Sequence, residues 1–343
     1  MTREAATYGQ TRVTVVGEVL VDLLWRAGAD LIAPAAGGSP ANVAVGLRRL
    51  GRPATLVTTW GEDLPGTRIA AHLDASGLDV IRVPGASGRS TVALAYLDDN
   101  GSATYDFLAS WDPERLEIPD GTAVLHTGSL AAVLEPGASE VLRLCRRAGA
   151  SAGCTVVVDL NVRPAVQPDR DAYRAACLRL AAVADVVKAS DEDLDWLFPG
   201  TAPDAAARLL ADRGPRLVVV TLGGEGALAV TATEEVRVPA RKITVVDTVG
   251  AGDSFQAALL DAIAAGSGRS ASETGGADGT GGTGRSTLPA TAEEIRTVLT
   301  RCVAAAAITC TRAGANPPTA AELDAALMPS LGADDRNFFD RHP

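Results

Sequence analysis

The chain has 343 residues, of which 47% are hydrophobic and 21% charged, so it can form one large α/β domain or two ordinary ones. The net charge of −11 at pH 7 argues against a nucleic-acid partner or an anionic membrane. We expect no secretory signal, because the N-terminal residues lack an apolar stretch, and no apolar run is long enough to cross a bilayer. Five cysteines without C-x-x-C spacing indicate reduced, buried thiols, so we expect a cytoplasmic protein.

Short apolar strands alternate with helical patterns along most of the chain. Strands are predicted at residues 13–16, 54–58, 80–83, 124–125, 155–160, 186–189, 217–221, 227–230 and 236–238. Helices are predicted at residues 39–50, 66–75, 138–148, 172–183, 191–197, 255–265 and 292–310. This alternation predicts an α/β fold with a mostly parallel sheet and helices on both faces.

Two β-rich runs, residues 90–97 and 103–108, interrupt the alternation. Asp98-Asp99-Asn100-Gly101 joins them, and Asn-Gly between β-rich runs is a strong signal for a hairpin. We expect a small separate sheet that acts as a lid, formed from residues 18–36 and 89–109.

The remaining boundaries follow from composition. Residues 12–328 are predicted to form one domain. Within it, the Gly/Ser/Thr-rich residues 266–287 are predicted to be a flexible insertion. Residues 329–343 are predicted to be a loose C-terminal tail.

The stretch Asp247-Thr-Val-Gly-Ala-Gly-Asp-Ser-Phe255 carries the clearest chemical signal. We predict a strand at residues 243–246, a tight turn at Gly250 and Gly252, and a helix that starts there. Such a turn presents free N–H groups and the positive end of a helix dipole to an anion. Asp253 is then either a helix cap or a base that accepts a proton from a hydroxyl attacking a phosphoryl group.

Polar residues and glycines follow several of the predicted strands. They are Asp22, Gly38, Asn42, Asn161, Gly223 and Asp253. Because ligands of open α/β sheets bind at the carboxyl ends of the strands, we expect these residues to share one site.

Two stretches together resemble the signatures of the PfkB (ribokinase-like) family of carbohydrate kinases. They are Gly37-Gly-Ser-Pro-Ala-Asn-Val-Ala44 and Asp247-Thr-Val-Gly-Ala-Gly-Asp253, and the likeness extends from about residue 13 to residue 326. The resemblance implies a three-layer ribokinase-like fold with a small β-sheet lid. It also implies an ATP-dependent phosphotransferase with an alcohol group as acceptor.

The resemblance assigns roles to individual residues. Asp253 corresponds to the catalytic base, and the amides of Gly250, Ala251 and Gly252 correspond to an anion hole for the transferred phosphoryl group. The expected sugar-binding residues are Asp22, Gly37, Gly38, Asn42, Tyr96, Phe107, Asn161 and Arg163. The expected nucleotide-binding residues are Ser190, Thr221, Gly223, Gly226 and Gly252.

ATP implies Mg²⁺, and relatives also bind a monovalent cation such as K⁺. Asp247, with backbone carbonyls near Val249 and Gly314, corresponds to the monovalent-cation site. The family's N-x-x-E element, which is linked to Mg²⁺, appears here as Ser190-Asp-Glu-Asp193. Asp193 is therefore the candidate for Mg²⁺, and Glu192 competes with it.

The segment Gly37–Asn42 is similar to the fructokinase branch, because Ser39 stands where ribokinases usually have Lys. A neutral hexose, most simply fructose, is therefore the expected substrate. 2-Keto-3-deoxygluconate kinases are the rival reading, and they typically add a Tyr/Arg cluster from the lid. The second lid run, Tyr105-Asp-Phe-Leu-Ala109, has no Arg, although Arg89 and Arg163 are possible substitutes.

Other classes are kept as alternatives. A non-catalytic sugar-binding regulator on the same fold would be expected to lose Asp253 or the anion-hole glycines, and all are present. A dinucleotide oxidoreductase would need G-x-G-x-x-G after the first strand, and Gly17-Glu-Val19 does not supply it. Lids of relatives pair between subunits, so a homodimer through the lid is expected.

Overall fold

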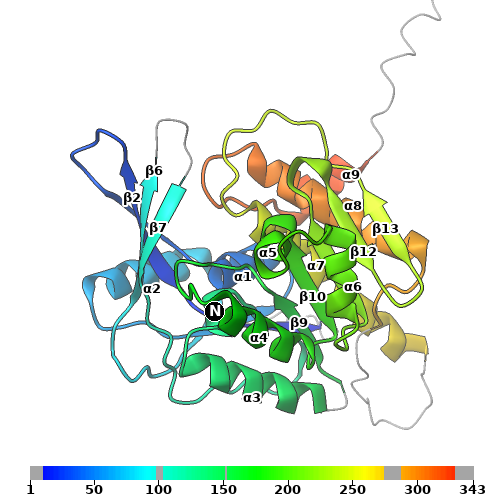
Figure 1. The fold of residues 1–343 in the computed structure, drawn as a ribbon, viewed down its shortest axis with the longest axis horizontal. Coiled ribbons are helices and arrows are strands. Elements are labelled where there is room, and N and C mark those ends of the chain that lie inside the picture. The colour runs from blue at the N-terminus through cyan, green and yellow to red at the C-terminus, as the bar shows by residue number, and fades with distance from the viewer. Residues whose placement is uncertain (1–10, 98–102, 151–152, 274–286, 329–343) are drawn as a thin grey trace, which may run out of the picture.

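The computed structural model describes residues 11–97, 103–150, 153–273 and 287–328. In this part of the chain, nine strands form one large sheet (Figure 1). Their spatial order is β13 (Glu235–Val238), β12 (Ala227–Val230), β11 (Leu217–Thr221), β10 (Val186–Ser190), β9 (Thr155–Asp159), β8 (Thr122–Gly128), β1 (Arg12–Val16), β4 (Ala54–Thr58) and β5 (Asp79–Arg82). Neighbours from β11 to β5 are parallel, and β12 and β13 are antiparallel additions at one edge.

Helices cover both faces of this sheet. One face packs against α1 (Ser39–Arg49), α2 (Leu64–Ser76), α7 (Ala251–Glu273), α8 (Ala292–Cys310) and α9 (Ala320–Leu327). The other packs against α3 (Gly137–Ala150), α4 (Arg170–Ala181), α5 (Asp191–Leu197) and α6 (Pro203–Ala211). Strand β9 shows why its three central residues are apolar: Val157 enters the first core, and Val156 and Val158 enter the second. The expected three-layer fold is confirmed.

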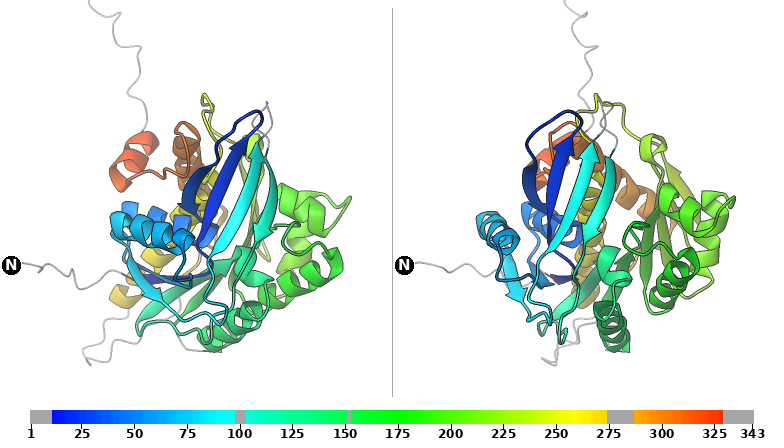
Figure 2. Two further views of the ribbon diagram at one scale, coloured as in Figure 1. Left: turned by 90° about the vertical axis from the view of Figure 1, so that its left-hand side faces the viewer. Right: turned by 60° about the vertical axis from the view of Figure 1, so that its left-hand side comes forward.

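A second, smaller sheet is formed in the order β3 (Ala33–Gly37), β2 (Leu20–Arg26), β6 (Thr91–Leu97) and β7 (Ala103–Leu108). Strands β6 and β7 pair antiparallel, as the hairpin prediction requires, while β2 and β6 are parallel. Figure 2 shows these blue and cyan strands as a layer separate from the large sheet. The turn at residues 98–102 lies outside the described residues.

The predicted strand at residues 243–246 is wrong. This segment has no regular structure, and Ile243, Val245 and Val246 are exposed. The Val246 N–H donates a hydrogen bond to the carbonyl of Cys310, at the end of α8, instead of to a strand. β-Branched residues form a strand only where a neighbouring strand is available, so composition alone misled the prediction.

The predicted flexible insertion also needs correction. Helix α7 continues to Glu273, so residues 266–273 are helical. Glycine in a helix costs only about 1 kcal/mol relative to alanine, and the Ala-rich start of α7 offsets that cost. Residues 274–286 and the predicted tail, 329–343, lie outside the described residues. No helix in the described part is long and apolar enough to cross a membrane.

Candidate active site

A cleft of about 790 Å³ opens between the small sheet and the carboxyl ends of the parallel strands. Most of the residues that the sequence assigns to a site line it. These are Asp22, Gly38, Asn42, Phe107, Asn161, Arg163, Ser190, Asp193, Thr221, Gly223, Val249, Gly250, Gly252 and Asp253. The fold therefore brings the two signature stretches to one place, as the common position after strands predicts.

Asp253 stands in the first turn of α7, where the helix dipole favours a carboxylate. The turn before it depends on Gly250, which has a φ of +76°. A side chain there would also collide with Ala315, since a Cβ would lie 2.7 Å from the Ala315 Cβ. Glycine is therefore required for α7 to start at this point.

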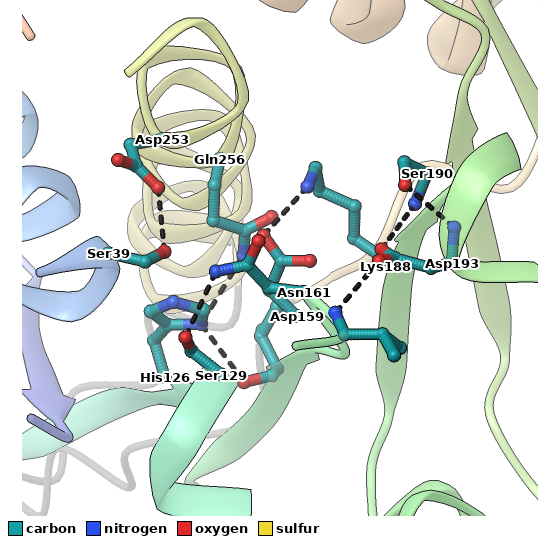
Figure 3. Close-up of polar contacts among 12 residues, drawn as sticks. Ser39, His126, Ser129, Asp159, Asn161, Lys188, Ser190, Asp193, Asp253 and Gln256 are labelled. Atoms are coloured by element: carbon teal, nitrogen blue, oxygen red, sulfur yellow. Dashed lines mark hydrogen bonds and ion pairs between the residues drawn. The ribbon is translucent and has the colours of Figure 1, made fainter. Parts of the chain in front are cut away.

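Both carboxylate oxygens of Asp253 are held by the start of α1. The Ser39 hydroxyl donates to Oδ1 at 2.6 Å, and Nδ2 of Asn42 donates to Oδ2 at 2.8 Å. Figure 3 shows Ser39 and Asp253 facing each other between the two helices. Burial raises the pKa of Asp253, and the hydrogen bonds from Ser39 and Asn42 oppose that rise. The result is a fixed, partly desolvated carboxyl group that is suited to taking a proton.

Asp22 lies in the middle of β2, opposite Ala35 and Ala93, and not at a strand end as the sequence suggested. Its carboxylate nevertheless reaches the cleft beside Gly37, where a Cβ would lie 3.3 Å from Oδ2. Burial raises the pKa of Asp22 to about 6, while Arg163 lowers it and the nearby Asp253 raises it. Asp22, Arg163 and Asp253 therefore share one electrostatic environment.

The amides at the start of α7 divide into two kinds. The N–H groups of Gly250, Gly252 and Asp253 have no acceptor within the described residues, as an anion hole requires. The N–H of Ala251 donates to the carbonyl of Thr248 at 3.2 Å. The expected contribution of Ala251 to the anion hole is therefore corrected in this structure, and Asp253 supplies the third free amide.

Asn161 and Arg163 follow β9. Asn161 has an unusual φ of +38°, and its Nδ2 donates to the Ser129 hydroxyl at 3.0 Å. Ser129, at the end of β8, also has a positive φ, of 55°. Two non-glycine residues with positive φ, joined by a hydrogen bond at the cleft wall, indicate a site built for a ligand.

Tyr96 does not reach the cleft, contrary to the sequence expectation. It pairs with Thr104, its ring lies 6.0 Å from that of Trp25, and its hydroxyl bonds to Asp106. Successive residues of a strand point to opposite faces, so Tyr96 faces away from the side that Phe107 occupies. The second lid aromatic that lines the cleft is Tyr105, stacked on Phe107 with 6.0 Å between ring centroids.

Gly226 and Gly37 do not line the cleft either. Gly226 has a φ of +106°, and a Cβ there would lie 2.1 Å from the carbonyl oxygen of Val238. The turn into β12 therefore requires glycine at this position. The preceding Gly223 does line the cleft, together with Thr221 and Ser190.

Both carboxylate oxygens of Asp193 accept hydrogen bonds from backbone N–H groups. Its Oδ1 accepts the N–H of Val162 at 2.7 Å, and its Oδ2 accepts the N–H of Ser190 at 2.8 Å, which completes a capping box at α5. Its assignment to Mg²⁺ is therefore corrected to a structural role. Glu192 lines the cleft, is exposed, and has no side-chain partner among the described residues.

Asp247, Val249 and Gly314 are brought together, as the sequence expectation requires. The Asp247 carboxylate accepts the N–H of Val249 at 3.0 Å and that of Gly314 at 2.8 Å. Within the described residues, no group of three or more His, Cys, Asp or Glu side chains could hold a metal ion. The assignment of these three residues to a monovalent cation stays a prediction.

The sequence profile described as pfkB family carbohydrate kinase matches residues 10–322. The chain belongs to this family. Fructokinase from Rhizobium leguminosarum bv. trifolii is 37% identical to it over 257 residues, which cover 72% of this chain and 78% of that protein. The predicted resemblance is confirmed, and the chain is a carbohydrate kinase with an alcohol group as acceptor.

Solved structures of pfkB-family kinases have the same fold as this chain. Fructokinase from Vibrio cholerae O395, in a form with fructose, ADP and a calcium ion, aligns with a TM-score of 0.75 and 26% identity, covering 93% of this chain and 100% of that one. A double mutant of that enzyme, with fructose, ADP and a potassium ion, aligns with a TM-score of 0.75 and 25% identity, covering 93% and 99%.

Several cleft residues of this pfkB-family chain are not predicted from the sequence. Glu18 is buried at the cleft wall, accepts the Ala131 N–H at 3.1 Å, and has a pKa that burial raises to about 7. The sequence predicts Ser39 as a helix start, and the structure shows that it is also the partner of Asp253. Lys188 lines the cleft from within β10. A charged residue inside an otherwise apolar strand was the available signal for Lys188.

Proposed function

We propose that this chain is a fructokinase that transfers the γ-phosphoryl group of ATP to a hydroxyl of fructose. The observation that carries the proposal is the geometry around Asp253. Its carboxylate is fixed by Ser39 and Asn42, and its helix presents free amides to the same cleft. A base and an anion site in one place are what phosphoryl transfer to an alcohol requires.

The sugar end of the cleft is formed by Asp22, Gly38 and Asn42. Asp22 accepts hydroxyl hydrogen bonds, and Asn42 fixes Asp253 while its amide oxygen remains an acceptor. Gly38 has a φ of +107°, and a Cβ there would lie 3.0 Å from the carbonyl oxygen of Glu18. A bulkier residue would therefore push the chain into the sugar space. Tyr105 and Phe107 close this end from the lid.

During transfer, Asp253 takes the proton of the attacking hydroxyl. The amides of Gly250 and Gly252 donate to the oxygens on which negative charge grows. ATP occupies the end of the cleft lined by Ser190, Thr221 and Gly223. Mg²⁺ bound with ATP would neutralise phosphate charge, and Glu192, an exposed carboxylate of the cleft, would hold it.

Fructose is favoured over an acidic sugar by the charges of the cleft. Arg89, one of the two candidate partners for a substrate carboxylate, does not line it. Arg163 does, but it already faces Asp22. An acidic substrate such as 2-keto-3-deoxygluconate would therefore compete with Asp22 for the same cation.

We further propose a homodimer through the small sheet. Its outer face exposes Trp25 and Tyr96, whose rings lie 6.0 Å apart, and its edge strand β7 exposes Leu108. Apolar side chains and unpaired strand edges favour association with a second copy. A cytoplasmic location fits the five free cysteines, which need a reducing environment, and the need for ATP.

The test is an ADP-release assay with fructose, ribose, 2-keto-3-deoxygluconate and nucleosides as acceptors, each with and without K⁺. The proposal expects the highest kcat/KM for fructose. A higher kcat/KM for 2-keto-3-deoxygluconate would overturn the assignment of fructose as the substrate, but it would still support the kinase activity. ADP release with none of the acceptors would favour a non-catalytic binding protein.

A further inference from the structure

Lys188 and Asp159 form a buried ion pair beneath the cleft. Nζ of Lys188 lies 2.7 Å from Oδ2 of Asp159, and their side chains are only 5% and 4% exposed. The two residues are register partners on the adjacent parallel strands β10 and β9. Lys188 is one of only two lysines in the chain, the other being Lys242. Figure 3 shows the pair close to the end of α7 that carries Asp253.

Stability does not explain this pair. Burying two charges removes both from water, and apolar residues of similar volume would stabilise such a core equally well or better. Val186, two positions earlier and therefore on the same face of β10, is a fully buried apolar residue. An apolar residue at position 188 would fit this strand, so the lysine is retained for another reason.

The position of Lys188 supplies that reason. It lines the cleft, and its Nζ lies 3.9 Å from the point where a Cβ of Gly252 would be. The free amide of Gly252 belongs to the anion hole described above. Lys188 thus stands beside the amides that face the transferred group.

The donors of Lys188 are only partly used. An ammonium group has three N–H donors, and within the described residues only Asp159 accepts from Nζ. Two donors are left for a ligand. The lysine is held in place by Asp159, so little side-chain entropy is lost when it binds.

The charges of the cleft make a cation necessary. Its lining includes the carboxylates of Glu18, Asp22, Asp191, Glu192, Asp193 and Asp253, and its only cations in the described chain are Lys188 and Arg163. Arg163 faces Asp22 at the sugar end. Lys188 lines the cleft and its partner Asp159 does not, so the pair presents its positive end to a nucleoside triphosphate at the transfer point.

We propose that Lys188 is a catalytic residue that donates hydrogen bonds to the γ-phosphoryl group during transfer, and that Asp159 is its positioning residue. This inference rests on the proposed kinase function. The acceptor oxygen forms a bond to the γ-phosphorus, and the bond from that phosphorus to the bridging oxygen of ADP breaks. The hydroxyl proton goes to Asp253, and Lys188 keeps its own protons throughout.

Two variants separate catalysis from packing. Lys188→Met leaves Asp159 charged and unpaired, which can unfold the protein. The double variant Lys188→Met/Asp159→Asn removes both charges and restores a neutral core. Lys242→Met is the matched control, because Lys242 is the other lysine and lies on the surface outside the cleft. Thermal unfolding confirms that each variant used is folded.

Steady-state kinetics give the first readout. Removal of one transition-state donor typically lowers kcat by about 10²- to 10³-fold, so the folded double variant is expected to show that loss with a nearly unchanged sugar KM. Lys242→Met is expected to keep the wild-type kcat. A double variant with wild-type kcat would overturn the proposal and leave the pair a structural one.

Ligand affinity gives a readout that does not need turnover. Titration with ADP, and with ADP plus tetrafluoroaluminate as a mimic of the transferred group, compares ground-state and transfer-like binding. The double variant is expected to bind ADP nearly as well as the wild type and the fluoroaluminate complex about 10²-fold more weakly. Equal losses for both would overturn the proposal. If the wild type phosphorylates no acceptor, the proposed function fails. The affinity for ADP with tetrafluoroaluminate, relative to that for ADP alone, still decides whether Lys188 contacts the transferred group.

Discussion

The Ser39 hydroxyl donates a 2.6 Å hydrogen bond to Oδ1 of Asp253, although the two residues are 214 positions apart. Ser39 begins α1, and Asp253 lies in the first turn of α7. The two helices approach closely further along, since a Cβ at Gly46 would lie 2.7 Å from the Cβ of Ala257. Helix packing therefore joins the two signature stretches into one site, and the hydrogen bond sets the orientation of the base.

Replacement of Ser39 should change the pH dependence of activity. The hydrogen bond from Ser39 lowers the pKa of Asp253, so Ser39→Ala should raise that pKa. The base is then protonated at a higher pH, and the acidic limb of the kcat/KM profile should shift upward. Ser110→Ala, which removes a hydroxyl outside the cleft, is the control. An unshifted limb in Ser39→Ala would disprove the coupling.

Asp22 should bind the sugar, and its ionisation should lower the stability of the folded protein. Its folded-state pKa of about 6 lies above its ordinary value of 3.8, so its contribution to the free energy of unfolding is lost as pH rises from about 4 to about 6. Asp22→Asn should therefore raise Tm relative to the wild type more at pH 7 than at pH 4. The same variant should increase the sugar KM far more than the ATP KM. A Tm difference that is independent of pH would contradict this.

The lid aromatics offer a matched pair. Tyr105→Ala should raise the sugar KM by about tenfold, corresponding to about 1.4 kcal/mol, because Tyr105 lines the cleft. Tyr96→Ala should leave the KM close to the wild-type value, because Tyr96 packs against Trp25 on the other face. The steady-state KM for fructose is the measurement. A larger increase in KM for Tyr96→Ala than for Tyr105→Ala would show that the wrong face of the lid has been assigned to the cleft.

Substitutions of Glu192 and Asp193 should have different effects, the first on Mg²⁺ binding and the second on stability. Glu192→Gln should raise the Mg²⁺ concentration needed for half-maximal activity with little change in Tm. Asp193→Asn should lower stability by about 1 kcal/mol, as expected for a lost helix cap, and leave the Mg²⁺ dependence nearly unchanged. Mg²⁺ titrations and thermal unfolding measure these effects. A stronger Mg²⁺ effect in the Asp193 variant would restore Asp193 as the metal ligand.

The sequence predicted the layers and the two helix starts because their signals are local. Gly250 and Asp253 lie within one turn of chain, and the run Val156-Val157-Val158 is apolar because both faces of β9 are buried. It missed the role of Lys188, because the partner Asp159 lies on another strand and the pair exists only after the sheet forms.

The lid shows a second limit. Tyr96 and Tyr105 are equally aromatic, and their faces depend on the register of β6 against β7. Adjacent residues of a strand point to opposite faces, so a shift of one position between β6 and β7 would place Tyr105 on the same face as Tyr96. Sequence gives the hairpin but does not give that register. The same holds for Asp193. Its carboxylate accepts the N–H of Val162, which follows another strand, and the N–H of Ser190 at the start of its own helix.

The central claim is that Asp253 is the base of a fructose-phosphorylating site. The most direct measurement is the rate of fructose phosphate formation from ATP by the wild type and by Asp253→Asn, with fructose affinity determined for both. We predict that the wild type forms the product, and that the variant loses about 10²- to 10⁴-fold in kcat while binding fructose nearly as well. An Asp253→Asn variant that phosphorylates fructose at the wild-type rate would contradict the account.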